Sequence, residues 1–367
     1  MSLSVYLHIP FCESKCNYCD FNSFANMESS FDDYVSALVR EIGETAELQS
    51  ANINTIFIGG GTPSTLPSSH IEKIMNALSV HKIAKDAEIT IEANPNSLTK
   101  GKLKIYKSLG INRLSIGLQA YQDCLLKLMG RPHSAKDFLR CAEDAMAVGF
   151  GNISADLIFA LPTQTLAEWD ESLRIASDAG LTHISCYGLI IEEGTPFYDK
   201  YEPIDDELDR RMYYIAVEFL KSNGFAQYEI SNFAKDGFKS RHNIAYWERE
   251  NYIGLGLSAH SMYNSVRFEN TSDLSKYING KNARENIMNL SQKDQMAEFM
   301  FLGLRMNEGI SMAKFLTEFG VDIQSVYGDV LRRNVENGLV EACGDMVRLS
   351  PIGIDLSNLV LSEFLMG

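Results

Sequence analysis

Three cysteines near the start of the sequence are spaced so that their thiolates can bind one metal centre. Cys12, Cys16 and Cys19 follow a Cys-x3-Cys-x2-Cys pattern. Four thiolates complete an iron–sulfur cluster or a structural zinc site, so three thiolates leave one metal position open for a substrate or cofactor. A structural zinc ion with His8 as the fourth ligand is the alternative. The aromatic residues of the loop, Tyr18 among them, favour a cluster that is shielded from water.

A run of glycines, Gly59 to Gly61, precedes Thr62 and Pro63. Glycines let backbone N–H and C=O groups approach a ligand closely, although a tight turn would explain the run equally well. Ser64 stands where a dinucleotide fingerprint needs its last glycine, and no Gly-Lys-Ser/Thr follows as in a P-loop. The run is therefore a candidate ligand contact of neither type.

Four further polar residues, at or near the ends of predicted strands or in loops, are candidates for ligand contacts. Glu92 could accept hydrogen bonds from hydroxyls or an ammonium group, because a buried carboxylate without partners is costly. Its alternative role is a helix-cap partner near Asn94. Gln119, Arg131 and Asp156 have ordinary alternatives as a strand-end amide, a surface arginine and a member of an internal ion pair.

A second distinctive stretch has the order His242-Asn243-x-x-Tyr246-Trp247. A histidine can bind haem iron, and aromatic rings can lie against a macrocycle. A histidine near aromatic residues is nevertheless more often structural. His260 is a further candidate ligand.

Six short apolar runs alternate with helix-like segments and must position these residues. The predicted strands are Ser4–Ile9, Thr55–Ile58, Ile89–Glu92, Arg113–Gly117, Ile153–Phe159 and His183–Leu189. Such alternation predicts an α/β fold with a parallel sheet, whose carboxyl strand ends form the ligand face. Six units are too few for a complete eight-fold barrel, so we expect a partial (β/α)6 barrel.

The remaining sequence divides into two parts. We expect the barrel to span residues 1–225, an irregular connecting region to span 226–290, and an α+β winged-helix-like domain to span 291–367. The last domain reads helix, helix, helix, hairpin, helix, with Asn337-Gly338 closing the third helix. That helix has few basic residues, so a protein-packing role is favoured over DNA reading.

The composition excludes several classes of protein. The chain has 367 residues, 45% of them hydrophobic, and a net charge of −15. Disorder is excluded, and the acidic charge argues against a nucleic-acid partner. No apolar run is long enough to span a membrane, so membrane contact is peripheral at most. The first residues lack a basic lead, so we expect no signal peptide and a cytoplasmic location, where reduced thiols persist. The other four cysteines are expected to be small hydrophobic residues: Cys124, Cys141, Cys186 and Cys343.

The segment from Tyr6 to Cys19 resembles the radical S-adenosylmethionine (SAM) superfamily, and the chain is similar to its oxygen-independent coproporphyrinogen III oxidase group. This resemblance implies that Cys12, Cys16 and Cys19 bind a [4Fe–4S] cluster, whose open iron binds SAM and whose reduction cleaves it to a 5′-deoxyadenosyl radical. It also implies SAM contacts for a further set of residues: Tyr6, Gly60, Gly61, Thr62 and Glu92. A second SAM position would be lined by Gln119, Arg131 and Asp156.

The stretch from His242 to Trp247 resembles a signature of the HemW-type haem chaperone branch of this group. Two features separate the chain from the oxidase: Phe21 replaces a cysteine, and only eleven residues precede Cys12. The resemblance therefore implies binding of haem and its transfer to haem-requiring membrane or respiratory proteins, with an electron donor such as a flavodoxin and a possible homodimer. The alternatives are the coproporphyrinogen III oxidase itself, a radical SAM methyltransferase and a zinc-stabilised interaction protein.

Overall fold

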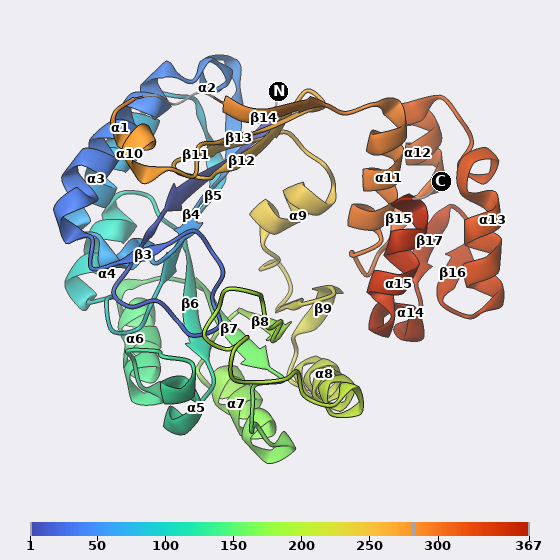
Figure 1. Cartoon of the computed structure of the whole chain (residues 1–367), viewed down its shortest axis with the longest axis horizontal. Helices are drawn as coiled ribbons and strands as arrows, with labels where there is room; N and C mark the ends of the chain where they lie inside the picture. Colours follow the sequence, from blue (N-terminus) through green and yellow to red (C-terminus); the bar gives the residue numbers. More distant parts are fainter. Residues whose placement is uncertain (1, 281–283, 366–367) are drawn as a thin grey trace.

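A computed structural model describes residues 2–280 and 284–365, which form a curved central sheet with a helical outer layer and a smaller module at one side (Figure 1). The six predicted strands are all present: β1 (Ser2–Ile9), β4 (Asn52–Gly60), β5 (Ile83–Ala93), β6 (Arg113–Gln119), β7 (Asn152–Phe159) and β8 (His183–Gly188). They pair in this order and are all parallel. The predicted partial α/β barrel is confirmed.

Helices cover the outer, convex face of the sheet (Figure 1). They are α1 (Phe31–Glu44), α3 (Ser68–Leu78), α4 (Lys100–Ser108), α6 (Ala135–Val148), α7 (Leu166–Asp178) and α8 (Asp206–Ser222). Helix α6 shows how the sequence sets these boundaries. Ser134 and Asp137 form a reciprocal capping box at its start, and Gly149 ends it with a left-handed φ of 99°.

The region 226–290, which we expected to be irregular, instead extends the sheet at both ends. β9 (Ala226–Glu229) and β10 (Asn232–Ala234) continue it antiparallel beyond β8. β11 (Tyr252–Leu255) pairs parallel with β1, followed by β12 (His260–Tyr263), β13 (Val266–Asn270) and β14 (Arg284–Asn289). The prediction of irregular structure is wrong because these strands are only three to six residues long and carry little periodic signal.

Short elements fill the loops of the barrel. They are β2 (Phe11–Cys12), β3 (Phe24–Ala25), α2 (Ala46–Ser50), α5 (Asp123–Leu128), α9 (Arg241–Trp247), α10 (Leu274–Ile278) and the 3-10 turns Glu28–Ser30 and Pro63–Thr65. Helix α9 is the important one, because it lies on the concave side of the sheet and faces the smaller module (Figure 1).

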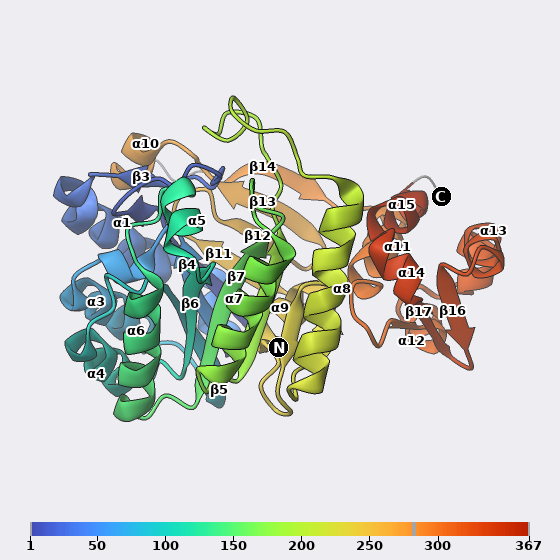
Figure 2. The same cartoon turned by 90° about the horizontal axis from the view of Figure 1, so that it is seen from below.

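The smaller module has its own hydrophobic core and packs beside α8 (Figure 2). Its elements are α11 (Gln292–Gly303), β15 (Ile310–Ser311), α12 (Met312–Phe319), α13 (Ile323–Glu336), β16 (Val340–Cys343), β17 (Met346–Leu349), α14 (Pro351–Asp355), α15 (Ser357–Ser362) and the 3-10 turn Glu363–Leu365. The order of helices and hairpin is the expected one, while the domain boundaries stay a prediction. Across residues 2–280 and 284–365, no helix combines the length and apolar character needed to cross a bilayer.

Candidate functional site

The cysteine loop follows β1 and is held by hydrogen bonds to a neighbouring loop. The backbone amide of Asn17 donates to the carbonyl of Met129 at 2.9 Å. Cys16 is buried, Cys12 and Cys19 are half-buried, and all three are free thiols. The loop thus presents three sulfur donors from one short, anchored segment.

The donor set fits a cluster better than a single ion. Within the part of the chain that the structure describes, no three His, Cys, Asp or Glu side chains converge as they would around one metal ion. In a [4Fe–4S] cluster each thiolate binds a different iron, so the sulfurs need not surround one point. His8 is also engaged: its Nδ1 lies 3.0 Å from the Tyr6 hydroxyl, and its Nε2 lies 3.0 Å from the Asn22 carbonyl oxygen. The zinc alternative therefore lacks a free fourth ligand.

Polar groups that suit an anionic cluster surround the thiols. Nη1 of Arg131 donates to Cys16 Sγ at 3.5 Å, and Oγ1 of Thr62 donates to Cys12 Sγ at 3.6 Å. Nη2 of Arg131 donates to Oδ1 of Asn94, while its buried Nε has no hydrogen-bond partner among the described residues. Hydrogen bonds to cluster sulfurs and nearby charge set the reduction potential of such centres.

The glycine run lies against this loop at distances that exclude side chains. A Cβ on Gly59 would lie 2.9 Å from Glu92 Oε2, and one on Gly61 would lie 2.7 Å from the Phe11 carbonyl oxygen. Gly60 has a φ of 111°, and a Cβ there would lie 2.6 Å from the His8 ring. The run is therefore a close approach of backbone to the site.

Two half-buried carboxyl groups, Glu92 on β5 and Asp156 on β7, lie close enough to influence each other. The amide of Gly60 donates to Glu92 Oε2 at 3.1 Å. Burial and the nearby Asp156 carboxyl raise the pKa of Glu92 to about 8. Asp156 accepts a hydrogen bond of 2.9 Å from Ser115, and burial raises its pKa as well. Such a pair favours a cationic ligand, because a positive group would stabilise both ionised forms.

Gln119, Arg131 and Tyr18 lie close to the same loop. A Cβ on Gly117 would lie 2.4 Å from Gln119 Nε2 and 2.8 Å from Arg131 Nη2, so these two side chains meet over that glycine. Gln119 is buried and has a left-handed φ of 68°. The Tyr18 ring packs against Phe197 with centroids 6.3 Å apart. The structure thus places Gln119 of β6 beside Arg131, and Arg131 in turn contacts Cys16 of the cysteine loop.

His242 is buried and does not line the cavity, and its contact with haem iron stays a prediction. Only 1% of the residue is exposed. Its Nδ1 lies 2.8 Å from Thr55 Oγ1, and its Nε2 lies 2.9 Å from the Tyr246 hydroxyl. Burial, followed by the nearby Arg113 cation, lowers the pKa of His242 to about 3. Both ring nitrogens are engaged, so the imidazole orients Tyr246.

Of the other three residues of this motif, Asn243 lies outside the cavity and Tyr246 and Trp247 line it. The backbone amide of Asn243 donates to Ser240 Oγ at 3.4 Å, at the start of α9, and its side chain does not line the cavity. Tyr246 and Trp247, from the last turn of α9, do line it. The aromatic half of the motif is therefore the half that reaches the site.

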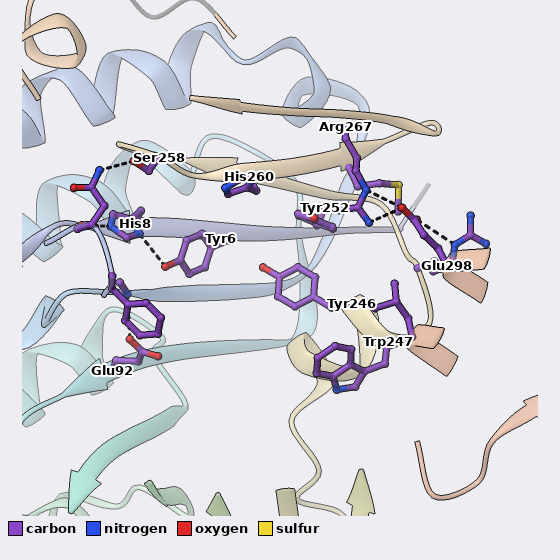
Figure 3. Close-up of a pocket in the computed structure, with 16 residues that line it drawn as sticks. Tyr6, His8, Glu92, Tyr246, Trp247, Tyr252, Ser258, His260, Arg267 and Glu298 are labelled. Atoms are coloured by element: carbon purple, nitrogen blue, oxygen red, sulfur yellow. Dashed lines mark hydrogen bonds and ion pairs between the residues drawn. The ribbon is translucent and has the colours of Figure 1, made fainter. Parts of the chain in front are cut away.

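A cavity of about 610 Å3 connects these residues (Figure 3). One end is lined by Tyr6, Gly60 and Glu92, and the middle by Tyr246 and Trp247. Several further lining residues were not predicted from the sequence, among them Arg249, Tyr252, Met262, Arg267 and Glu298.

The far end of the cavity carries two cations that share one carboxylate. Arg267 Nη2 lies 2.9 Å from Glu298 Oε1, and Arg249 Nε lies 3.7 Å from Glu298 Oε2. Glu298 belongs to α11 of the smaller module, so the module closes this end. No sequence signal joins these residues, although the alternation of His260 and Met262 on β12 indicates a shared face.

Two family models match the chain. Residues 6–176 match the radical SAM superfamily, and residues 290–356 match the HemN C-terminal domain. In structure the chain is similar to coproporphyrinogen III oxidase (HemN) from Escherichia coli, with a TM-score of 0.86, 21% identity, and coverage of 99% of this chain and 89% of that one. At this identity the likeness shows the fold alone.

Sequence relatives are similar over nearly their full lengths. The protein named heme chaperone HemW of Bacillus subtilis is 39% identical, with 99% of each chain covered. The protein of the same name from Escherichia coli is 33% identical, with 99% of this chain and 98% of that one covered. A zebrafish (Danio rerio) protein, radical S-adenosyl methionine domain-containing protein 1, mitochondrial, is 33% identical, with 89% and 78% covered.

Proposed function

Because the chain belongs to the HemW family of radical SAM proteins, we propose that it is a haem chaperone that binds haem and transfers it to haem-requiring proteins. The cavity between α9 and the strands β11 to β13 is the observation that carries this proposal. Its volume of about 610 Å3 falls within the usual range for cofactor sites.

The lining of the cavity suits an anionic, aromatic macrocycle. Tyr246, Trp247 and Tyr252 offer flat apolar surfaces for stacking. Arg249 and Arg267 pair with Glu298 and Glu318, so their charges are balanced, but the guanidinium groups could also bind a carboxylate such as a porphyrin propionate.

The opposite end of the cavity suits the radical SAM cofactors. Cys12, Cys16 and Cys19 would hold a [4Fe–4S] cluster, which when bound supplies an electron to SAM. The backbone of Gly60 and Gly61 would accept the amino acid part of SAM. A second set of side chains would orient it: Tyr6, Thr62 and Glu92, with Gln119, Arg131 and Asp156 beside them.

We propose a reduced, cytoplasmic setting and a flavodoxin-like electron donor. All seven cysteines are free, which is typical of a reducing compartment. The proposed recipients are haem-requiring membrane or respiratory proteins, and a homodimer is a further proposal. Gel filtration with and without haem tests the dimer, because a dimer elutes at twice the mass of the chain.

Coproporphyrinogen III oxidase is the second candidate function, favoured by the shared fold. Phe21 argues against it, because the oxidase has a cysteine at this position. An anaerobic assay for protoporphyrinogen separates the two functions, since a chaperone binds haem without converting the precursor.

Haem titration of the anaerobic, cluster-loaded protein tests the chaperone function. We expect a Soret shift, and haem that stays with the protein through gel filtration. Trp247→Ala should weaken this binding, because it removes an aromatic wall of the cavity. Tyr198→Ala is the matched control, since this exposed aromatic residue lies outside the cavity. Absence of any Soret shift in the wild-type protein would contradict the proposal.

A further inference from the structure

We propose that His260 is the axial ligand through which the chain binds haem iron. This inference rests on the proposed haem-binding function and assigns the iron contact within the same cavity. His260 begins β12, and its ring lies across the cavity from Tyr246 and Trp247 of α9 (Figure 3). A macrocycle between these two walls would have the imidazole on one face and aromatic side chains on the other.

The other imidazoles near the cavity cannot serve without losing hydrogen bonds. His242 is buried and both of its ring nitrogens are engaged, by Thr55 and Tyr246. His8 lines the cavity, but Tyr6 and the Asn22 carbonyl oxygen engage both of its nitrogens. Removing either ring from its partners would leave buried polar atoms unsatisfied, which is costly.

The lining also contains three phenols and one thioether that can bind haem iron. Burial is the largest cause that raises the pKa of Tyr6, Tyr246 and Tyr252, so their phenolate forms are disfavoured. Met262 lines the cavity but is only 5% exposed, so its sulfur is less accessible than the His260 ring. His260 is therefore the most accessible nitrogen or sulfur donor among the described residues of the lining.

The surroundings of His260 leave it free to bind metal. Its side chain is 69% exposed. Among the described residues, the one polar partner of its ring is Glu269, whose Oε2 lies 3.0 Å from Nε2 in an ion pair. An exposed ion pair is weak, so iron can replace it. Glu269 also accepts a hydrogen bond from Asn286 Nδ2, so the carboxylate keeps a partner when the histidine leaves.

The test compares four full-length, cluster-loaded proteins by ferric haem titration and electron paramagnetic resonance. They are the wild type, His260→Ala, His242→Ala and Met262→Leu. We expect His260→Ala to bind haem about ten-fold more weakly or worse and to lose the histidine-ligated signal. Added imidazole should restore the signal by filling the vacated position, whereas His242→Ala and Met262→Leu should keep it.

The outcomes separate this inference from the proposed function. If His260→Ala binds haem with the wild-type signal and affinity, the ligand assignment is wrong and the chaperone function stands. A loss of the signal in Met262→Leu instead would assign the iron to the thioether and overturn the proposal. If the wild type itself binds no haem, the proposed function fails. His260→Gln provides a second variant that keeps a hydrogen bond to Glu269, should the alanine variant fold poorly.

Discussion

Replacing Gly60 by alanine should both destabilise the protein and weaken SAM binding, although it adds only one methyl group. The residue has a φ of 111°, which L-amino acids with a side chain rarely adopt. The new Cβ would lie 2.6 Å from the His8 ring, so the ring must move. That movement breaks the contacts of His8 with Tyr6 and the Asn22 carbonyl oxygen.

The expected loss can be estimated from these two effects. A residue other than glycine in such a backbone conformation costs about 1–3 kcal/mol. Each of the two lost hydrogen bonds of His8 adds about 0.5–1.5 kcal/mol. We therefore expect Gly60→Ala to destabilise the protein by roughly 2–6 kcal/mol.

Thermal unfolding and SAM binding calorimetry measure the two consequences. We expect a lower melting midpoint for Gly60→Ala and weaker SAM binding, because the shifted ring occupies the proposed SAM pocket. Gly43→Ala in α1 is the matched control, since its Cβ would meet no atom within 4 Å and alanine favours a helix by up to about 1 kcal/mol. Wild-type melting and SAM affinity in Gly60→Ala would refute the reasoning.

Three other changes test the site. Cys16→Ser should abolish the iron–sulfur absorbance of anaerobic protein, because two thiolates cannot hold the cluster. His242→Ala should lower the denaturation midpoint by an amount equivalent to about 2–4 kcal/mol, because it opens a cavity and strands the polar groups of Thr55 and Tyr246. The pKa of Glu92 is raised to about 8, so its protonation stabilises the folded protein fully below the pKa of the unfolded chain. This stabilisation is lost as the pH rises to about 8, with a slope of at most about 1.4 kcal/mol per pH unit. Urea titrations of Glu92→Gln should lack this decline.

Each of these variants has an outcome that contradicts its reasoning. A brown Cys16→Ser protein with wild-type iron content would exclude Cys16 as a cluster ligand, for which Cys124→Ser at an exposed site is the control. A His242→Ala protein with wild-type stability would show that the two hydrogen bonds contribute little. A Glu92→Gln protein that declines with pH as the wild type does would place the titration elsewhere, with Asp156, whose pKa is also raised, the first candidate.

The sequence predicted the barrel and the cofactor end of the site well, for a physical reason. Strand–helix alternation is a local signal, and residues that follow parallel strands must gather at one edge. Cys12, Gly60 and Glu92 therefore come together in the structure as the strand order requires. The roles of these residues in SAM binding stay a prediction.

The end of the cavity proposed to bind haem could not be predicted in the same way. His242 and Tyr246 are four residues apart on α9, and the sequence does not show which one points into the barrel wall. The pairing of Arg267 with Glu298 joins a short strand to a helix of another module, a contact without any local signal. The sequence therefore identified the motif, but it did not show that Tyr246 and Trp247 line the cavity while His242 is buried.

The parallel pairing of β11 with β1 has a consequence for the order in which the protein becomes competent during translation. Ribosomes add about 5–20 residues per second, so one edge of β1 waits roughly ten seconds or more for its partner. All the proposed cluster and SAM residues have emerged by Asp156, long before α9, β11 or α11 exists. The proposed cluster ligands of a nascent chain are thus available to iron and sulfide well before the cavity proposed to bind haem has formed.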